Sequence, residues 1–282
     1  MANIPQKVHD RLVAGIKKFQ PVLVAAQQRE ASESDTVIII TAILSEIFGY
    51  DPFKEITSEI AIRGTYCDLA TKFDANIQSL IEAKAINQKL QESHVTQAVG
   101  YASTKGVDWV VLTSGMVWQV YKVTFTKPID REKVVEIDFL QLDYHKPDDL
   151  EALFLLTKES WQKSALSDYY DKNQALSPFT IGQVLLTEPV LAVIRRELKR
   201  ISPEVKIEID KIVEVLEQEV LKQNVVVGDK AEEAHKRVAR AANRAKRDKA
   251  EKESDVAGVT PAVQNKTPAV STADAPPVPI KN

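Results

Sequence analysis

The sequence is poor in cysteine and has no long hydrophobic run. Cys67 is the only cysteine among 282 residues, so one chain can form neither a disulfide framework nor a cysteine-based zinc site. That composition fits a reducing, cytoplasmic setting. The longest apolar run, TVIIITAIL, is far too short to cross a bilayer, and the first residues show no secretory signal pattern. We therefore expect a cytoplasmic protein that is not embedded in a membrane.

The chain also lacks a strong excess of either charge. Its 37 basic and 40 acidic side chains give a net charge of -3, so the molecule as a whole is not a basic nucleic-acid binder. Any surface that binds a polyanion would have to be local. The length allows one or two domains, and a hydrophobic content of 44% is ordinary for a globular protein.

The spacing of apolar residues changes along the chain and divides its first half into two segments. Residues 1–32 have helical spacing around Pro21, which predicts one kinked helix or two short ones. Residues 33–145 predict a helix, capped by Ser34 or Asp35, then three strands, a second helix and two or three further strands. This order predicts an α/β fold, a mixed sheet flanked by helices.

The second half of the chain predicts no strands. Residues 146–228 are expected to form a helical lobe, with helices near 148–164, 180–200 and 203–223. Residues 229–282 begin with an alanine-rich, charged stretch that predicts a solvated helix or a disordered segment. They end in a proline- and alanine-rich tail that is typical of disorder.

Two acids and a lysine lie on neighbouring predicted strands in CDLATKFDANIQSLIEAKA. Glu82 and Lys84 share one face of their strand, and Asp68 on the preceding strand can reach the same face across a tight turn. Paired carboxylates repel each other unless a cation lies between them, and oxygen ligands favour Mg²⁺ or Mn²⁺. The carbonyl oxygen of Ala83 offers a further ligand. A metal beside Lys84 is suited to activating water against a phosphodiester, whereas the alternative is an ordinary ion pair.

A second pattern follows on the next predicted helix, where QAVGY places Gln97 and Tyr101 four residues apart on one face. The combination D-x13-E-x-K with Q-x-x-x-Y resembles the PD-(D/E)XK nuclease superfamily. Residues 33–125 resemble the N-terminal nuclease domain of the R subunit of type I restriction enzymes. The resemblance implies that the two acids bind Mg²⁺, the lysine is catalytic, and the glutamine and tyrosine shape the site.

The resemblance also implies one more acidic ligand, because members of the superfamily often add a glutamate from the first helix. Glu46 is the expected residue at that place. Glu59, on the first predicted strand, is the rival.

The expected function is therefore metal-dependent endonucleolytic hydrolysis of DNA phosphodiester bonds. The type I R subunit continues into an ATP-driven motor, but this sequence has no G-x-x-x-x-G-K-[ST] motif. The alternative is a non-cleaving nucleic-acid-binding protein, or a subunit of a restriction or defence complex that requires an ATPase motor as its partner. RNA remains open as a substrate.

Overall fold

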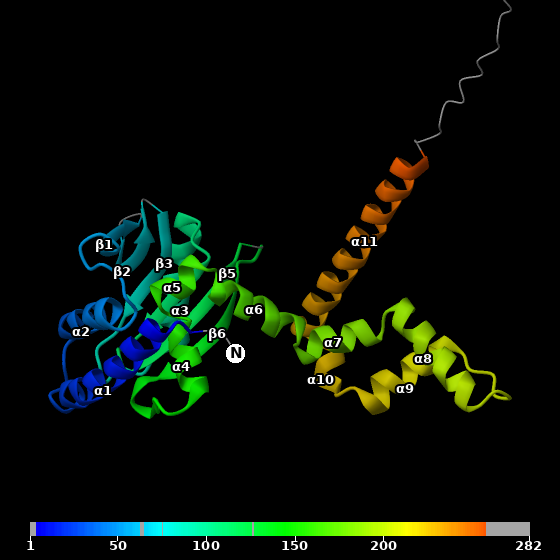
Figure 1. Cartoon of the computed structure of the whole chain (residues 1–282), viewed down its shortest axis with the longest axis horizontal. Helices are drawn as coiled ribbons and strands as arrows, with labels where there is room; N and C mark the ends of the chain where they lie inside the picture. Colours follow the sequence, from blue (N-terminus) through cyan, green and yellow to red (C-terminus); the bar gives the residue numbers. More distant parts are fainter. Residues whose placement is uncertain (1–3, 63–64, 75, 126, 258–282) are drawn as a thin grey trace, which may run out of the picture. The chain divides into compact units, whose positions relative to one another are not determined.

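The chain folds into two compact units, Met1–Gln174 and Ala175–Asn282, which we call the sheet unit and the helical unit (Figure 1). This computed structural model describes residues 4–62, 65–74, 76–125 and 127–257. The predicted disordered tail therefore lies outside the described residues from 258 onward. Among the helices described, none is both long and apolar enough to cross a membrane.

A six-stranded sheet forms the centre of the sheet unit, and its strands lie side by side in the order of the sequence. The strands are β1 (Ile56–Ile62), β2 (Thr65–Phe73), β3 (Asn76–Ala83), β4 (Trp109–Thr113), β5 (Val117–Thr124) and β6 (Asp130–Asp138). The pair β3 and β4 is parallel and all other neighbours are antiparallel, so the predicted mixed sheet is confirmed.

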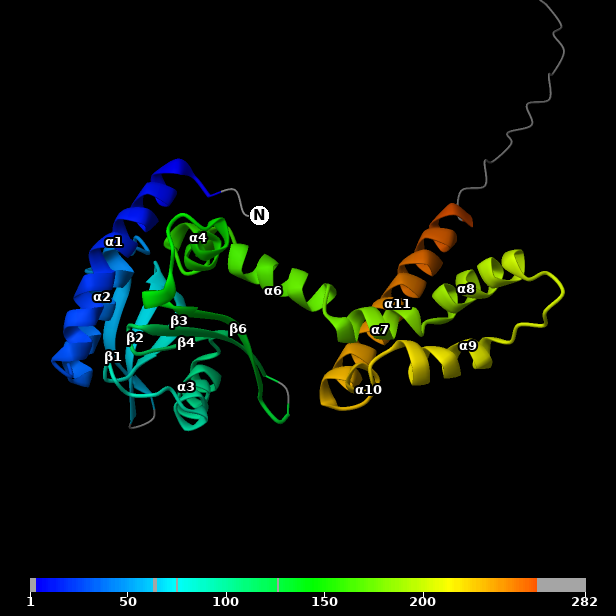
Figure 2. The same ribbon diagram turned by 90° about the horizontal axis from the view of Figure 1, so that it is seen from below.

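Helices cover both faces of this sheet. Figure 2 shows α1 (Gln6–Gln28), α2 (Glu33–Glu46) and α4 (Pro147–Phe154) on one face and α3 (Glu92–Lys105) on the other. The α3 helix joins the two parallel strands β3 and β4, as a crossover connection must. The β-branched run of α2 is helical because Ile39, Ile40 and Ile43 recur at a spacing that buries one stripe.

The first domain boundary expected from the sequence, between 32 and 33, does not separate two bodies. Leu12 and Ile16 of α1 are fully buried in the same cluster as Ile40 of α2 and Ile81 of the sheet. The amphipathic first helix therefore supplies part of the wall of the sheet core. Pro21 lies inside this single helix rather than ending it.

The second expected boundary, between 145 and 146, is also displaced. The chain divides after Gln174, because Leu150, Leu153 and Phe154 of α4 are buried in the core under the sheet. Trp161 of α5 (Lys158–Gln162) packs edge-on against Trp109 of β4. The helix expected at 148–164 is thus two short helices, and α6 (Ala165–Ala175) follows them.

The helical unit has a much thinner core. Its α-helices are α7 (Pro178–Leu185), α8 (Glu188–Ile201), α9 (Ile209–Val215), α10 (Gln223–Val226) and α11 (Asp229–Ala257), and a π-helical turn, η2 (Leu216–Val220), directly follows α9. The helix expected from 203 begins only at Ile209, after Pro203 has followed the end of α8. The charged stretch is helical in α11, which is one of the two predicted states.

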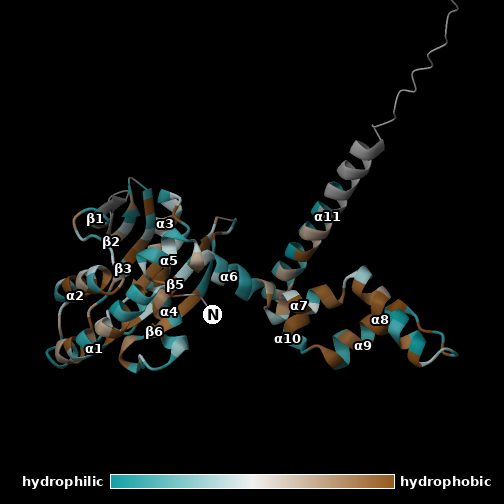
Figure 3. Cartoon of the chain, in the orientation of Figure 1, coloured by the Kyte–Doolittle hydropathy of each residue, from teal (hydrophilic) through white to brown (hydrophobic). Residues whose placement is uncertain are grey.

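Many large apolar side chains of the helical unit remain exposed. Figure 3 shows hydrophobic residues along α7, α8 and α9, whereas teal residues alternate with paler ones in the coloured part of α11. The exposed large hydrophobic residues of this unit are Leu176, Ile181, Val184, Val193, Leu198, Ile201, Val205, Val215, Val220 and Val227. Where such residues form a contiguous patch, they are suited to contacts with another molecule.

Candidate active site

The register of β2 and β3 brings the two predicted acids together. The two strands are antiparallel and Leu69 is paired with Ile81. The residue before Leu69, Asp68, therefore lies opposite the residue after Ile81, Glu82. Side chains alternate along β3: Ile81 and Ala83 enter the core beneath α1 and α2, whereas Leu80 packs toward α3 on the other face. The same alternation turns Glu82 toward α3.

Backbone N–H groups at the end of β3 hold the side chain of Asp68 and the main chain at Lys84. The N–H of Ala83 donates a hydrogen bond of 2.8 Å to Oδ2 of Asp68. One residue later, the N–H of Lys84 donates to the carbonyl oxygen of Thr113 at 2.8 Å, which carries the parallel pairing with β4 beyond the end of the strand. Asp68 and Lys84 are therefore both held at the point where β3 ends.

Glu82 receives two donors on one oxygen and none on the other. Its Oε1 accepts hydrogen bonds from Nζ of Lys84 at 2.7 Å and from Nε2 of Gln97 at 3.1 Å. The same Nε2 donates to the hydroxyl of Tyr101 at 2.9 Å, so both predicted α3 residues reach the site. Oε2 of Glu82 is buried and has no hydrogen-bond partner among the described residues.

This orphaned oxygen is energetically costly for the isolated fold. Glu82 is only 2% exposed, and a buried polar atom left without a partner costs on the order of 1–3 kcal/mol, more when the group is charged. Natural structures leave few buried polar atoms unsatisfied, and a bound water, an ion or a catalytic role accounts for many of those that remain. Among the described residues, only Glu82 Oε2 and Ser160 Oγ are buried without a partner, and only the oxygen of Glu82 lies beside a second carboxylate. The free oxygen is thus the place where an electron-pair acceptor would be most favourable.

The electrostatics of the three groups agree with that assignment. Burial raises the pKa of Glu82, and the hydrogen bond from Lys84 only partly opposes it. Burial likewise raises the pKa of Asp68, against the N–H of Ala83 and the charge of Lys84. Burial alone would lower the pKa of Lys84, but the hydrogen bond and charge of Glu82, with the charges of Glu33 and Asp68, raise it. The surroundings therefore favour the charged form of Lys84 and disfavour the charged forms of Asp68 and Glu82.

The donor set suits a hard divalent cation. Asp68 and Glu82 supply two carboxylates, and Mg²⁺ is commonly held by one or two carboxylates together with waters and substrate phosphates. The described residues contain no cluster of three acid, histidine or cysteine side chains, so a cation here would complete its shell from water and substrate. The carbonyl of Ala83 as a ligand stays a prediction.

Glu46, the residue expected as a third acid, lies at the opposite end of α2 from the acid that reaches Lys84. Glu46 is the last residue of α2 and forms an ion pair with Lys18 of α1. The structure brings Glu33 to the site instead, with its Oε2 3.6 Å from Nζ of Lys84. The two glutamates are separated by 13 residues of helix, or about 20 Å along its axis, so they cannot substitute for each other.

The N-cap of α2 is the sequence feature from which the place of Glu33 in the first turn of the helix could have been predicted. Ser32 is the N-cap, with its side chain accepting a hydrogen bond from the N–H of Asp35, rather than Ser34 or Asp35 as expected. Glu33 then occupies the first turn, where a negative charge is stabilised by the helix dipole. Glu59, the rival candidate, is aligned with Asp68 by the β1–β2 register, but its side chain lies outside the described part of the chain.

Cys67 is adjacent to the site but is chemically quiet. Burial first, and then the charges of Glu82 and Asp68, raise the pKa of its thiol to about 12. Its Sγ lies 3.4 Å from the carbonyl oxygens of Leu69 and Ile81. A thiol held in this way stays protonated and is no nucleophile at neutral pH.

Comparisons of the chain with known protein families, with curated proteins and with solved structures find no match. The function of the site is therefore inferred from its own side chains.

Proposed function

We propose that this chain is a metal-dependent nuclease of the PD-(D/E)XK type that hydrolyses DNA phosphodiester bonds. Asp68 and Glu82 would hold a Mg²⁺ ion, for which Mn²⁺ can substitute. Lys84 would act on the phosphate, and Gln97 and Tyr101 would hold Glu82 in position. The strand order, the crossover helix and the juxtaposition of these five side chains support the proposal.

The observation that carries the proposal is the unpartnered Oε2 of Glu82. A carboxylate kept only for stability gains most when both of its oxygens accept hydrogen bonds. Here Lys84 and Gln97 converge on Oε1, while Oε2 stays buried and free beside a second carboxylate. That arrangement is poor as a structural ion pair and suitable as half of a cation site.

The residues divide the chemistry between them. A bound divalent cation would polarise a phosphate oxygen and lower the pKa of a bound water. Lys84 is held as an ammonium by the acids around it, so its role is to stabilise the negative charge that develops on the phosphate. Gln97 fixes the rotamer of Glu82 by donating to it, and Tyr101 in turn accepts from Gln97. The negative charge of Glu33 helps to raise the pKa of Lys84.

One observation favours the alternative of a subunit that acts within a larger complex. The exposed hydrophobic residues of the helical unit offer a surface for a protein partner. An ATPase motor is the partner that the resemblance to type I restriction enzymes suggests. In that case the same site would cut only when the partner is present.

Plasmid cleavage tests the proposal. Purified full chain is incubated with supercoiled DNA in Mg²⁺, Mn²⁺ or EDTA, beside the variants Glu82→Gln and Lys84→Met. We expect nicking that requires the metal, and a loss of about 10²–10³-fold in rate in each variant, which is the usual effect of removing one preorganised electrostatic group. Single-stranded DNA and RNA substrates run in parallel define the substrate class.

The matched control is the Glu136–Lys133 pair of β6, an acid and a lysine on the same sheet that are both about half exposed. Glu136→Gln and Lys133→Met should cleave like the wild type. Equal cleavage by all five proteins would assign the nicking to a contaminant and reject the site. A wild type that neither cleaves nor binds Mn²⁺ would reduce the cluster to a structural ion pair.

A further inference from the structure

The α11 helix carries a row of basic residues on one side. Lys236, Arg237, Arg240, Arg244 and Arg247 fall within an arc of about 100° when successive residues are turned by 100°. We call these five residues the basic stripe. Between Glu233 and Asp248 the sequence has no acidic residue, so the positive charge along this length of helix is not interrupted.

The opposite side of α11 faces its own unit. Ala231 and Ala234 are buried, and Val238 and Ala242 line a groove that α11 shares with residues of α7 and α8. Lys236, at one edge of the stripe, also lines this groove. At the edge of the stripe, Nη1 of Arg237 lies 3.4 Å from the hydroxyl of Thr180 on α7. Packing therefore fixes which side of the helix is outward, and Arg240, Arg244 and Arg247 are exposed.

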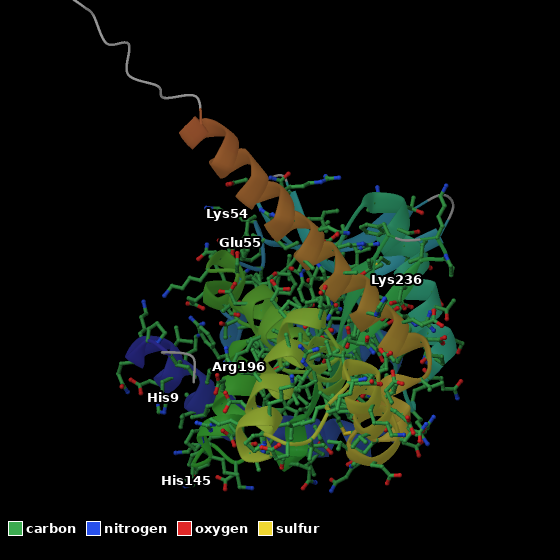
Figure 4. The ribbon with its side chains drawn as sticks, turned by 90° about the vertical axis from the view of Figure 1, so that its right-hand side faces the viewer. His9, Lys54, Glu55, His145, Arg196 and Lys236 are labelled. Atoms are coloured by element: carbon green, nitrogen blue, oxygen red, sulfur yellow. The ribbon has the colours of Figure 1, made fainter. Side chains whose placement is uncertain are left out.

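A second basic helix in the same unit shows what makes the stripe different. The α8 helix carries Arg195, Arg196, Lys199 and Arg200, but Glu197 forms ion pairs with Arg196 at 3.5 Å and with Arg200 at 2.9 Å. Figure 4 shows Arg196 on α8 and Lys236 on α11. The α8 charges are thus partly neutralised by an acid among them. On α11, Lys236 is paired with Glu232 at 4.0 Å, but no acidic residue lies between Arg240 and Arg247 in the sequence.

We propose that the basic stripe binds the phosphate backbone of duplex DNA. This inference deepens the proposed nuclease function and rests on it for the identity of the polyanion. From Arg237 to Arg247 the helix rises about 15 Å, a length over which one strand of a duplex presents about four phosphates. Arginine suits this contact because its guanidinium can bind a phosphate through two parallel hydrogen bonds.

The composition of α11 indicates which kind of polyanion the basic stripe binds. The helix has no aromatic residue on which unpaired bases could stack, so single-strand binding by stacking is disfavoured. Its remaining side chains are mainly alanine and charged residues, and it lacks the large apolar residues that insert an amphipathic helix into a lipid surface. A backbone-binding, sequence-independent contact with duplex DNA is what remains.

The test is the salt dependence of duplex binding. Fluorescence anisotropy with a labelled duplex of about 20 base pairs, in EDTA and from about 50 to 200 mM NaCl, compares the full-length wild type with two triple variants. Arg240→Gln/Arg244→Gln/Arg247→Gln removes the exposed part of the stripe. Arg195→Gln/Arg196→Gln/Arg200→Gln removes the same charge from α8, and glutamine preserves helix propensity in both.

We expect the α11 variant to bind at least about tenfold more weakly at low salt. Its log–log salt slope should be shallower by about 2.7, or 0.9 for each lost phosphate contact. The α8 variant should stay within about twofold of the wild type. The variant Arg240→Lys/Arg244→Lys/Arg247→Lys keeps the point charges and should recover most of the slope, which separates lost contacts from a lost fold.

Three results would overturn the proposal that the basic stripe binds duplex DNA. They are an equal loss in both glutamine variants, an unchanged slope in the α11 variant, or a loss of binding to phosphatidylserine vesicles with duplex binding intact. Because EDTA prevents metal-dependent cleavage, the result does not depend on the nuclease site. Glu82→Gln should lose cleavage and keep stripe binding, so failure of one proposal is distinguished from failure of the other.

Discussion

Among the glutamates of the sheet unit that pair with a cation, Glu159 and Glu82 have opposite surroundings. Glu159 receives Nη1 and Nη2 of Arg11 on its two oxygens at 2.9 and 2.6 Å. Nε of Arg11 is also satisfied, by the carbonyl oxygen of Ile47 at 2.8 Å. Burial raises the pKa of Glu159, but the hydrogen bond and charge of Arg11 outweigh it and lower the pKa below its ordinary value.

Glu82 has the opposite balance, because Lys84 and Gln97 share one of its oxygens and its pKa is raised. The Arg11–Glu159 pair joins α1 to α5 and is complete as it stands, so it serves stability. The Glu82–Lys84 pair is incomplete, so its ionised form costs free energy that a ligand could recover. The contrast teaches that an acid and a cation in contact indicate a site only when hydrogen-bonding capacity is left over.

The largest expected effect is that of Asp68→Asn on cleavage. The substitution removes one carboxylate of the proposed cation site and should lower the cleavage rate about 10³-fold or more. Because burial raises the pKa of Asp68, its charge opposes folding at neutral pH, and asparagine can still accept from the N–H of Ala83. The melting temperature without metal should therefore be unchanged or higher. A lower melting temperature with intact cleavage would make Asp68 a structural residue.

The next effect is on stability rather than on cleavage. Arg11→Met leaves Glu159 partly buried and without its bidentate partner, and should lower the free energy of unfolding by about 1–3 kcal/mol. That range allows for solvent screening of side chains that are 24% and 29% exposed. Urea unfolding measures the change, and the cleavage rate per folded molecule should not alter. The control Lys211→Met breaks an exposed pair with Glu214 and should leave the midpoint nearly unchanged.

The pH dependence of stability should run in opposite directions for the two sites. The lowered pKa of Glu159 gives stability that is present above its unfolded pKa of about 4.3 and is lost as pH falls through the folded value. The difference between wild type and Arg11→Met should therefore shrink below about pH 4. The raised pKa of Asp68 has the reverse sign, so any advantage of Asp68→Asn should disappear as acid neutralises the wild-type carboxyl. As pH falls, Arg11→Met should therefore gain stability relative to the wild type, whereas Asp68→Asn should lose it. Unfolding curves at a series of pH values check both trends, and a shift of the two variants in the same direction relative to the wild type would contradict the contrast.

The sequence predicted the mixed sheet and the meeting of Asp68, Glu82, Lys84, Gln97 and Tyr101, because both depend on local periodicity. The change from helical to alternating spacing marks β1 to β3, and the turn between β2 and β3 sets Asp68 against Glu82. Gln97 and Tyr101 follow from the four-residue spacing on a helix that must cross over the same strands.

The parts that were missed depend on long-range packing. Leu153 and Phe154 have the helical spacing expected of a separate lobe, and periodicity cannot tell which surface such a stripe will cover. They lie in the sheet core, which moves the boundary to Gln174. The proximity of Glu33 to Lys84 was missed for a local reason, because a cap at Ser34 or Asp35 would leave Glu33 outside the helix that Ser32 in fact begins.

The smallest expected effect distinguishes the two glutamates of α2. Glu33 lies 3.6 Å from Nζ of Lys84 but is about half exposed, so solvent screens its charge. Glu33→Gln should slow cleavage by less than about tenfold, and added salt should reduce the difference from the wild type because the lost interaction is already weakened by screening. Glu46→Gln, which removes the same charge from the far end of the helix, should cleave at the wild-type rate. If Glu46→Gln were the slower of the two, the sequence-based placement would be right, and the contact between Glu33 and Lys84 would have no part in the reaction.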